Sequence, residues 1–176
     1  RLGGPNTIQS VAGVTFNNRG GVLNYPGSST GAELETIGVA VNVAGQSQWN
    51  LAQNTGNQTR ISIGVFTAQS GANHGSLILN AGAAGTLGGL APGANVVNVI
   101  ASTPNLVGVN PAVAGSVING VRPDILGIDS SNLTGGLVTH DANGFRLLTA
   151  AEYQALPGGT GLGATLTGLT SNGSGV

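Results

Sequence analysis

The chain has 176 residues, of which 32 are glycine, and only 6% are charged, against about 25% in an ordinary soluble domain. A net charge of −1 excludes the basic surface needed to bind nucleic acid or an anionic membrane. The absence of cysteine excludes disulfide bonds and thiolate metal sites, and no apolar run approaches the roughly 18 residues of a membrane span.

The first predicted elements are two short β-strands near the N-terminus. Residues 11–16 and 22–25 are rich in Val, Phe and Tyr, which favour strands, and a Gly-Gly pair at 20–21 forms a corner between them. The sequence numbers of Gly13 and Gly38 differ by 25, so this strand pair is predicted to be a less regular copy of the pattern that follows it.

Residues 36–80 contain one pattern twice: an apolar strand, a glycine corner, a second strand and a polar turn. Equivalent residues are 26 apart in four pairs, namely Gly38/Gly64, Val39/Val65, Gly45/Gly71 and Leu51/Leu77. A fixed period of this length, with no helix between the copies, predicts an all-β fold in which parallel coils stack, a β-solenoid.

The later part of the chain divides at its prolines. Another strand pair is expected near residues 95–100, so residues 1–101 form the regular solenoid coils. Proline lacks the backbone N–H that a strand ladder uses, and residues 102–123 contain three prolines, so this segment is predicted to be an irregular excursion. Residues 124–176 are expected to continue the solenoid.

Residues 124–153 hold four of the six carboxylates and several local signals. Asn143-Gly144 predicts a hairpin or a corner. Thr149 and Glu152 have the spacing of a capping box, which predicts one short helical turn near 150–156.

The candidate catalytic cluster in this region is His140, Asp141 and Arg146. An enzyme that cleaves acidic polysaccharide needs carboxylates and a cation on one face, to bind the uronate and abstract a proton. The alternative is structural: Asp141 caps the turn at 143–144, and Arg146 pairs with a nearby acid. Adjacent residues of a strand point to opposite faces, which argues against a His140–Asp141 dyad and favours the structural alternative.

Two further kinds of site have weak signals. Asp124 and Asp129 are oxygen donors suited to calcium, but no Asp-rich glycine loop surrounds them. Residues 85–93 are rich in glycine without standing between a strand and a helix, so they do not form a phosphate cradle. We therefore predict no metal, no cofactor and no catalytic residues.

The aromatic residues offer a possible sugar-binding surface. A stacking ladder for glycans would form if four aromatic rings were exposed, those of Phe16, Trp49, Phe66 and Phe145. Leu51 and Leu77 are in phase with Trp49, which favours burial of the tryptophan instead. Trp49 is thus a candidate ligand contact, and core packing is the competing interpretation.

Two passages resemble a known family. Residues 20–25 (Gly-Gly-Val-Leu-Asn-Tyr) and 35–38 (Glu-Thr-Ile-Gly) resemble the "GGTL…G…ETVG" repeat of autotransporter-associated β-strand repeat proteins. Residues 137–153 are similar to a "FATYDANGIRALTAAEY" passage of the same bacterial proteins, with His140 in place of the usual Tyr. The resemblance implies a right-handed parallel β-helix, secreted to the bacterial cell surface. Because the chain begins at Arg1 rather than Met, we also expect it to be a processed product or a segment of a longer polypeptide.

The expected function is that of an extracellular structural protein and not of an enzyme. The chain would be a subunit or segment of a cell-surface fibre or matrix, self-associating through stacked β-coils. Its partners would be copies of itself or further repeats of the same polypeptide, with surface glycans as a second candidate; nucleic acid is not expected. A carbohydrate-binding adhesin module is the alternative, and a polysaccharide-degrading β-helix enzyme is the third hypothesis.

Overall fold

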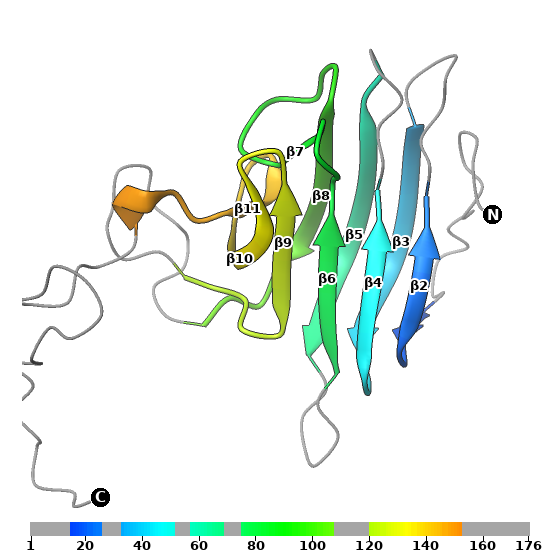
Figure 1. The fold of residues 1–176 in the computed structure, drawn as a ribbon. Coiled ribbons are helices and arrows are strands. Elements are labelled where there is room, and N and C mark those ends of the chain that lie inside the picture. Colours follow the sequence, from blue (N-terminus) through cyan, green and yellow to red (C-terminus); the bar gives the residue numbers. More distant parts are fainter. Residues whose placement is uncertain (1–14, 26–32, 52–56, 69–74, 108–119, 153–176) are drawn as a thin grey trace, which may run out of the picture.

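The computed structural model describes residues 15–25, 33–51, 57–68, 75–107 and 120–152, and almost all of their regular structure is β-strand (Figure 1). The elements are β1 (Thr15–Asn18), β2 (Gly21–Asn24), β3 (Glu33–Asn42), β4 (Gln46–Asn50), β5 (Thr59–Ala68), β6 (Ser76–Asn80), β7 (Thr86–Leu87), β8 (Val96–Thr103), β9 (Ile125–Asp129), β10 (Asn132–Asp141), β11 (Gly144–Leu147) and the short 3-10 helix η1 (Ala150–Glu152). The described part of the chain contains no helix long and apolar enough to cross a membrane.

The strands form two sheets, one behind the other (Figure 1). The first sheet has the order β1-β3-β5-β8-β7, and the second has the order β2-β4-β6-β9-β10-β11. All neighbours from β1 to β7 in the first sheet, and from β2 to β9 in the second, are parallel. From β1 to β6 the chain alternates between the sheets, and it then adds β7 and β8 to the first sheet and β9 to the second. We call four strand pairs windings: β1–β2, β3–β4, β5–β6 and β8–β9.

The predicted period holds between β3 and β5. Val39 pairs with Val65 and Ile37 with Ile63, each at a sequence offset of 26, so this prediction is confirmed. The prediction for Leu51 and Leu77 is wrong, because the offset between β4 and β6 is 30 and Leu77 pairs with Ser47. The physical reason is the connection before β6, residues 69–75, which is four residues longer than the connection before β4, residues 43–45.

The first winding also differs from its predicted spacing of 25. Strand β1 pairs with β3 at an offset of 24, and β2 pairs with β4 at an offset of 26. Gly13 and Gly71, which belong to the predicted pairs, lie outside the described residues.

The repeated glycine marks the point where the inward-facing positions shift. Ile37 and Ile63 are buried, and the next buried residues are Ala40 and Phe66, three positions later rather than two. A Cβ atom on Gly64 would lie 2.5 Å from the carbonyl oxygen of Gly38 in the strand beside it. The strands can therefore stack closely at this shift only if residue 64 is glycine.

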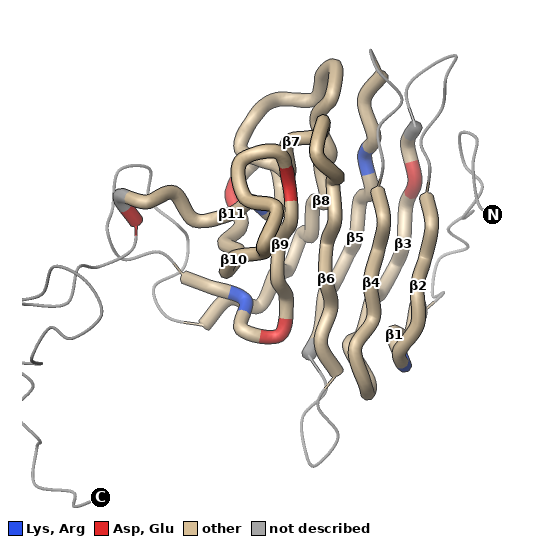
Figure 2. The backbone as a smooth tube through the Cα atoms, viewed as in Figure 1, with Lys and Arg blue, Asp and Glu red and all other residues tan. Residues whose placement is uncertain are grey.

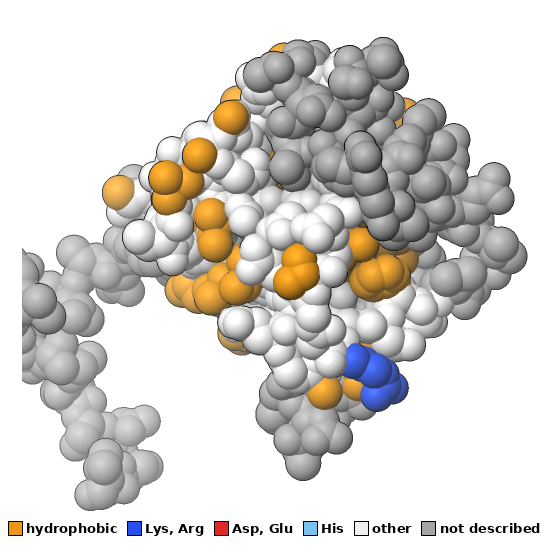
Figure 3. Space-filling model, turned by 45° about the vertical axis from the view of Figure 1, so that its right-hand side comes forward, with side chains coloured by type: hydrophobic (Ala, Val, Ile, Leu, Met, Phe, Trp, Pro, Cys, Tyr) orange, Lys and Arg blue, Asp and Glu red, His pale blue; other side chains and the backbone are white. Residues whose placement is uncertain are grey.

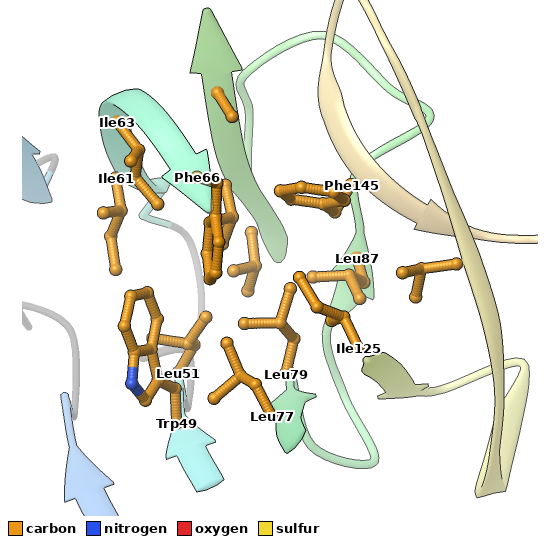
Figure 4. Close-up of a cluster of buried hydrophobic side chains, with 14 of the residues drawn as sticks. Trp49, Leu51, Ile61, Ile63, Phe66, Leu77, Leu79, Leu87, Ile125 and Phe145 are labelled. Carbon is orange, nitrogen blue, oxygen red and sulfur yellow. The ribbon is translucent and has the colours of Figure 1, made fainter. Parts of the chain in front are cut away.

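The core lies between the sheets as one hydrophobic cluster (Figure 4). Phe16, Ala40 and Phe66 are in register on β1, β3 and β5, so a small side chain stands between two rings. Trp49 of the second sheet fills that space, with its ring centroid 5.4 Å from Phe16 and 6.1 Å from Phe66. Phe145 of β11 continues the aromatic packing, 5.7 Å from Phe66.

Residues 125–129 continue the parallel stack as β9, as expected, but the strands after β9 do not. Strand β10 is antiparallel to β9, and β11 is antiparallel to β10. Each connection has only two residues, 130–131 and 142–143, whereas a parallel crossover needs about a dozen. The Asn143-Gly144 signal, which predicted either a hairpin or a corner, lies at a hairpin turn between β10 and β11. The short helix η1 begins at residue 150, as predicted. The rest of the predicted helical turn, residues 153–156, lies outside the described part of the chain.

Between β8 and β9 the described residues leave both sheets. Val107 and Val121 form an isolated antiparallel bridge that closes this segment. Arg122, next to the bridge, is buried and forms an ion pair with Asp124 at 2.6 Å. Its guanidinium also donates to the backbone oxygen of Phe66 at 2.7 Å and lies over the ring of that residue. Arg122 thereby attaches the irregular segment to the end of β5.

Candidate functional site

Charged side chains are sparse along the chain, and most of the described ones lie near β9, β10 and β11 (Figure 2). Strands β2, β4 and β6 contain none. The predicted cluster of His140, Asp141 and Arg146 falls in the charged region, on the β10–β11 hairpin.

Asp141 holds the turn of this hairpin. Its Oδ1 accepts a hydrogen bond from the backbone N–H of Asn143 at 2.7 Å, and it pairs across the hairpin with Gly144. Gly144 has a φ of +103°, and a Cβ atom there would lie 2.5 Å from the carbonyl oxygen of Val99. The turn therefore needs glycine both for its backbone conformation and for its contact with β8.

Arg146 joins the hairpin to η1. It forms ion pairs with Asp141 at 3.0 Å and with Glu152 at 2.7 Å. The hydrogen bond from Arg146 lowers the pKa of Glu152 to about 2, although burial opposes the shift. Glu152 also accepts from the backbone N–H of Thr149 at 2.7 Å, as the predicted capping box requires. The structural roles predicted for Asp141 and Arg146 are confirmed.

His140 has partners of its own. Its Nε2 accepts a hydrogen bond from the backbone N–H of Ala101 in β8 at 3.0 Å, and its ring packs edge-on against Phe145 at 4.8 Å. Burial lowers the pKa of His140 to about 4, and the nearby charge of Asp141 opposes the shift only partly. The ring is therefore neutral near pH 7, with its proton on Nδ1, and it acts as an acceptor at the edge of β8.

The two aspartates considered as calcium ligands lie at opposite ends of β9, Asp124 just before the strand and Asp129 as its last residue. Asp124 accepts from Arg122 and, at 2.7 Å, from Asn42 Nδ2. Asp129 accepts from the backbone of Leu87 at 3.0 Å and from Ser131. Within the described residues, no group of three or more His, Asp or Glu side chains could hold a metal ion.

Trp49 is 1% exposed, so its ring is not available to stack on a sugar. Its Nε1–H donates to Asn18 Oδ1 at 3.0 Å inside the protein. Burial of Trp49 was expected because Leu51 lies two positions further along the chain and faces the same side. This prediction is confirmed, since both side chains lie in the core.

Two hollows open on the described surface. One, of about 190 Å³, lies at the N-terminal end and is lined by residues that include Phe16, Leu23 and Trp49. The other, of about 760 Å³, lies beside β7 and β11 and is lined by residues that include Leu90, Asp129 and Arg146. In the larger hollow, Asp129 and Arg146 already have the internal partners described above.

Two ladders of asparagine, which were not predicted from the sequence, link neighbouring windings. Asn50 Nδ2 donates to Asn24 Oδ1 at 2.8 Å, and Asn80 Nδ2 donates to Asn50 Oδ1 at 3.2 Å, so three successive windings are linked. In the other ladder, Asn18 Nδ2 donates to Asn42 Oδ1 at 2.8 Å. The first ladder could have been found from the sequence, because Asn24 and Asn50 are 26 residues apart, as are the like residues of β3 and β5.

Comparisons of the chain with protein-family models, with curated proteins and with solved structures gave no match.

Proposed function

We propose that the chain is a right-handed parallel β-helix that works as an extracellular structural protein, a subunit or segment of a bacterial cell-surface fibre or matrix. It associates with copies of itself through stacked β-strands. The observation that carries this proposal is the stacking of like side chains in register, in which Asn24, Asn50 and Asn80 are linked along the direction of stacking.

The ladder favours further stacking because each amide has both a donor and an acceptor. An asparagine in the middle of such a row accepts from one neighbour and donates to the other, as Asn50 does. Asn24, at the end of the row, is exposed and accepts from Asn50. Amide ladders of this kind stabilise stacked strands in fibrous assemblies.

The low charge of the chain supports the same function. A net charge of −1 leaves little repulsion between copies. Five of the six carboxylates, Glu35, Asp124, Asp129, Asp141 and Glu152, have a hydrogen-bond partner within the chain. These contacts support a structural role for the carboxylates.

Right-handed winding is supported by a general rule of β-structure. A strand connected by a crossover to a parallel neighbour in the same sheet turns right-handedly in about 98% of cases. The links from β1 to β3 and from β3 to β5 are crossovers of this type, because each passes through a strand of the second sheet.

Self-association of the full chain tests the proposal. Sedimentation velocity and electron microscopy over a wide range of protein concentration are expected to show association with no added ligand and unchanged β-structure by circular dichroism. Dispersed monomers at every concentration would refute the structural function. Association only after addition of a polysaccharide would favour the adhesin alternative. Surface labelling of intact producing cells tests the location separately.

A further inference from the structure

A line of side-chain hydrogen bonds crosses the stack. Trp49 Nε1 donates to Asn18 Oδ1 at 3.0 Å, and Asn18 Nδ2 donates to Asn42 Oδ1 at 2.8 Å. Asn42 Nδ2 donates in turn to Asp124 Oδ2 at 2.7 Å, just before β9. We call these four residues the relay. The first three are at most 4% exposed, and Asp124 is ion-paired with the buried Arg122 at 2.6 Å. The relay therefore joins the first, second and fourth windings.

The two ends of the relay fix the direction of every hydrogen bond in it. The indole N–H of Trp49 can only donate, and the ionised carboxylate of Asp124 can only accept. Each amide between them has to accept on the side of the indole and donate on the side of the carboxylate. Reversing either amide would leave a donor facing a donor, or an acceptor facing an acceptor, inside the protein. The charge of Asp124 thus orients the acceptor that Trp49 uses, although two amides separate them.

The charge at position 124 has no substitute near the other end of the relay. Strands β1, β2 and β4 contain no charged residue. Figure 3, turned toward this side of the molecule, shows uncharged side chains over most of the described surface, with basic atoms at one place. A basic group cannot accept a hydrogen bond, so the direction of the relay is set from the fourth winding.

The relay passes over the third winding. Strand β5 has Ala68 where β1 and β3 have Asn18 and Asn42, so no amide follows on that strand. Asp124 of the next winding is the partner of Asn42 instead. A Cβ atom on Gly75, just before β6, would lie 2.7 Å from the carbonyl carbon of Asn42. The third winding can therefore lie this close to the second, beside the relay, only because residue 75 is glycine.

This connection differs from the usual pattern of stacked repeats. In most such proteins each repeat contacts only its neighbours, so an outer repeat can open while the inner ones stay folded. Here a contact across 82 positions connects the second winding directly to the fourth. Opening the fourth winding would leave the Nδ2 donor of Asn42 without its acceptor. Opening the second would remove a donor from the carboxylate that is paired with Arg122.

We infer that the relay makes the four windings one cooperative unit, which opens as a whole and not winding by winding from one end. Asp124 is the positioning residue of this device, and Arg122 holds it in place. Arg122 also donates to the backbone oxygens of Phe66 and Pro104, so the start of the irregular segment after β8 belongs to the same unit. The inference does not depend on the proposed function.

Hydrogen exchange in the unmodified full chain tests the inference without any substitution. The chain has one tryptophan, so its indole N–H gives a single NMR resonance. This proton and the backbone amides of β4 and β9 are expected to exchange through openings whose equilibrium constants agree within about tenfold and depend equally on urea. Opening constants for β4 and β9 that differ by more than about tenfold would show that the windings open separately, and would overturn the inference.

Two aspartate variants test the role of Asp124. Asp124→Asn removes the charge that orients the amides, so β4 is expected to open at least about tenfold more often than β9, and the indole resonance is expected to move to lower frequency. Asp141→Asn removes a carboxylate that also pairs with an arginine, but outside the relay. It is expected to keep β4 and β9 together and to leave the indole resonance in place. If the two variants behave alike, Asp124 is not the positioning residue and the inference fails.

Discussion

Replacement of Trp49 by alanine should lower the free energy of unfolding by about 3–5 kcal/mol, the usual cost of truncating a large buried aromatic side chain. Trp49 is 1% exposed and lies between the rings of Phe16 and Phe66, with Ala40 in register between them. Those rings come from β1 and β5, which are not neighbours in the sheet. They cannot close the space left by Trp49 without moving the strands, so the value should fall in the upper part of this range.

Loss of the indole also removes a hydrogen bond. Its Nε1–H donates to Asn18, which in turn is linked to Asn42. Trp49→Phe keeps most of the apolar volume and removes this donor, so we expect a smaller loss of about 1–2 kcal/mol. The difference between the two variants separates the contribution of packing from that of the hydrogen bond.

Urea unfolding followed by circular dichroism measures both variants. In the unmodified chain, fluorescence of the single tryptophan should shift to longer wavelength at the same midpoint. A loss below about 0.5 kcal/mol for Trp49→Ala, typical of a surface substitution, would refute the placement of Trp49 in the core. If that result came with loss of glycan binding, Trp49 would be a surface platform for sugars.

Three further predictions concern the strand contacts and the hairpin. Gly64→Ala should cost about 1–3 kcal/mol in urea unfolding, because its Cβ atom meets a backbone oxygen of the next strand, whereas Gly93→Ala, with its nearest atom at 3.7 Å, should cost little. Arg146→Ala should cost about 2 kcal/mol by leaving two carboxylates without their cation, while Arg19→Ala, exposed in a turn, should change stability by less than about 0.5 kcal/mol. Equal costs within either pair would contradict the geometry. The pKa of His140 is about 4 in the folded chain against an ordinary value of 6.5, so the unfolded chain binds the proton first as pH falls. Stability should therefore be highest above pH 6.5 and fall by about 1–2 kcal/mol toward pH 4, less than the full shift because solvent screens a partly exposed ring; His140→Gln should remove this part of the pH dependence.

Several features could be predicted because the sequence repeats them or encodes them locally. The pairing of β3 with β5 follows from like residues 26 apart, and the shared glycine marks the same shift in both strands. The hairpin turn and the contact between Thr149 and Glu152 depend on residues within a few positions of each other. Burial of Trp49 followed from its phase with neighbouring apolar residues.

Other features could not be predicted because they depend on loop length or on contacts between distant residues. The offset between β4 and β6 is set by the number of residues between β5 and β6, which no repeat in the sequence fixes. Arg122 contacts Phe66 across 56 positions, and Asn98 contacts Asn143 across 45, with no local pattern linking either pair.

The sequence by itself determined that β3 and β5 stack in parallel with like side chains together, because a period of 26 brings the same residues into register. Only the tertiary structure decided how the chain continues after β9. The strands after β9 fold back across the stack because their connections have only two residues, because Phe145 packs against Phe66 of β5, and because His140 accepts a hydrogen bond from Ala101 of β8. That packing exists only once the preceding windings have formed a surface for the hairpin to cover.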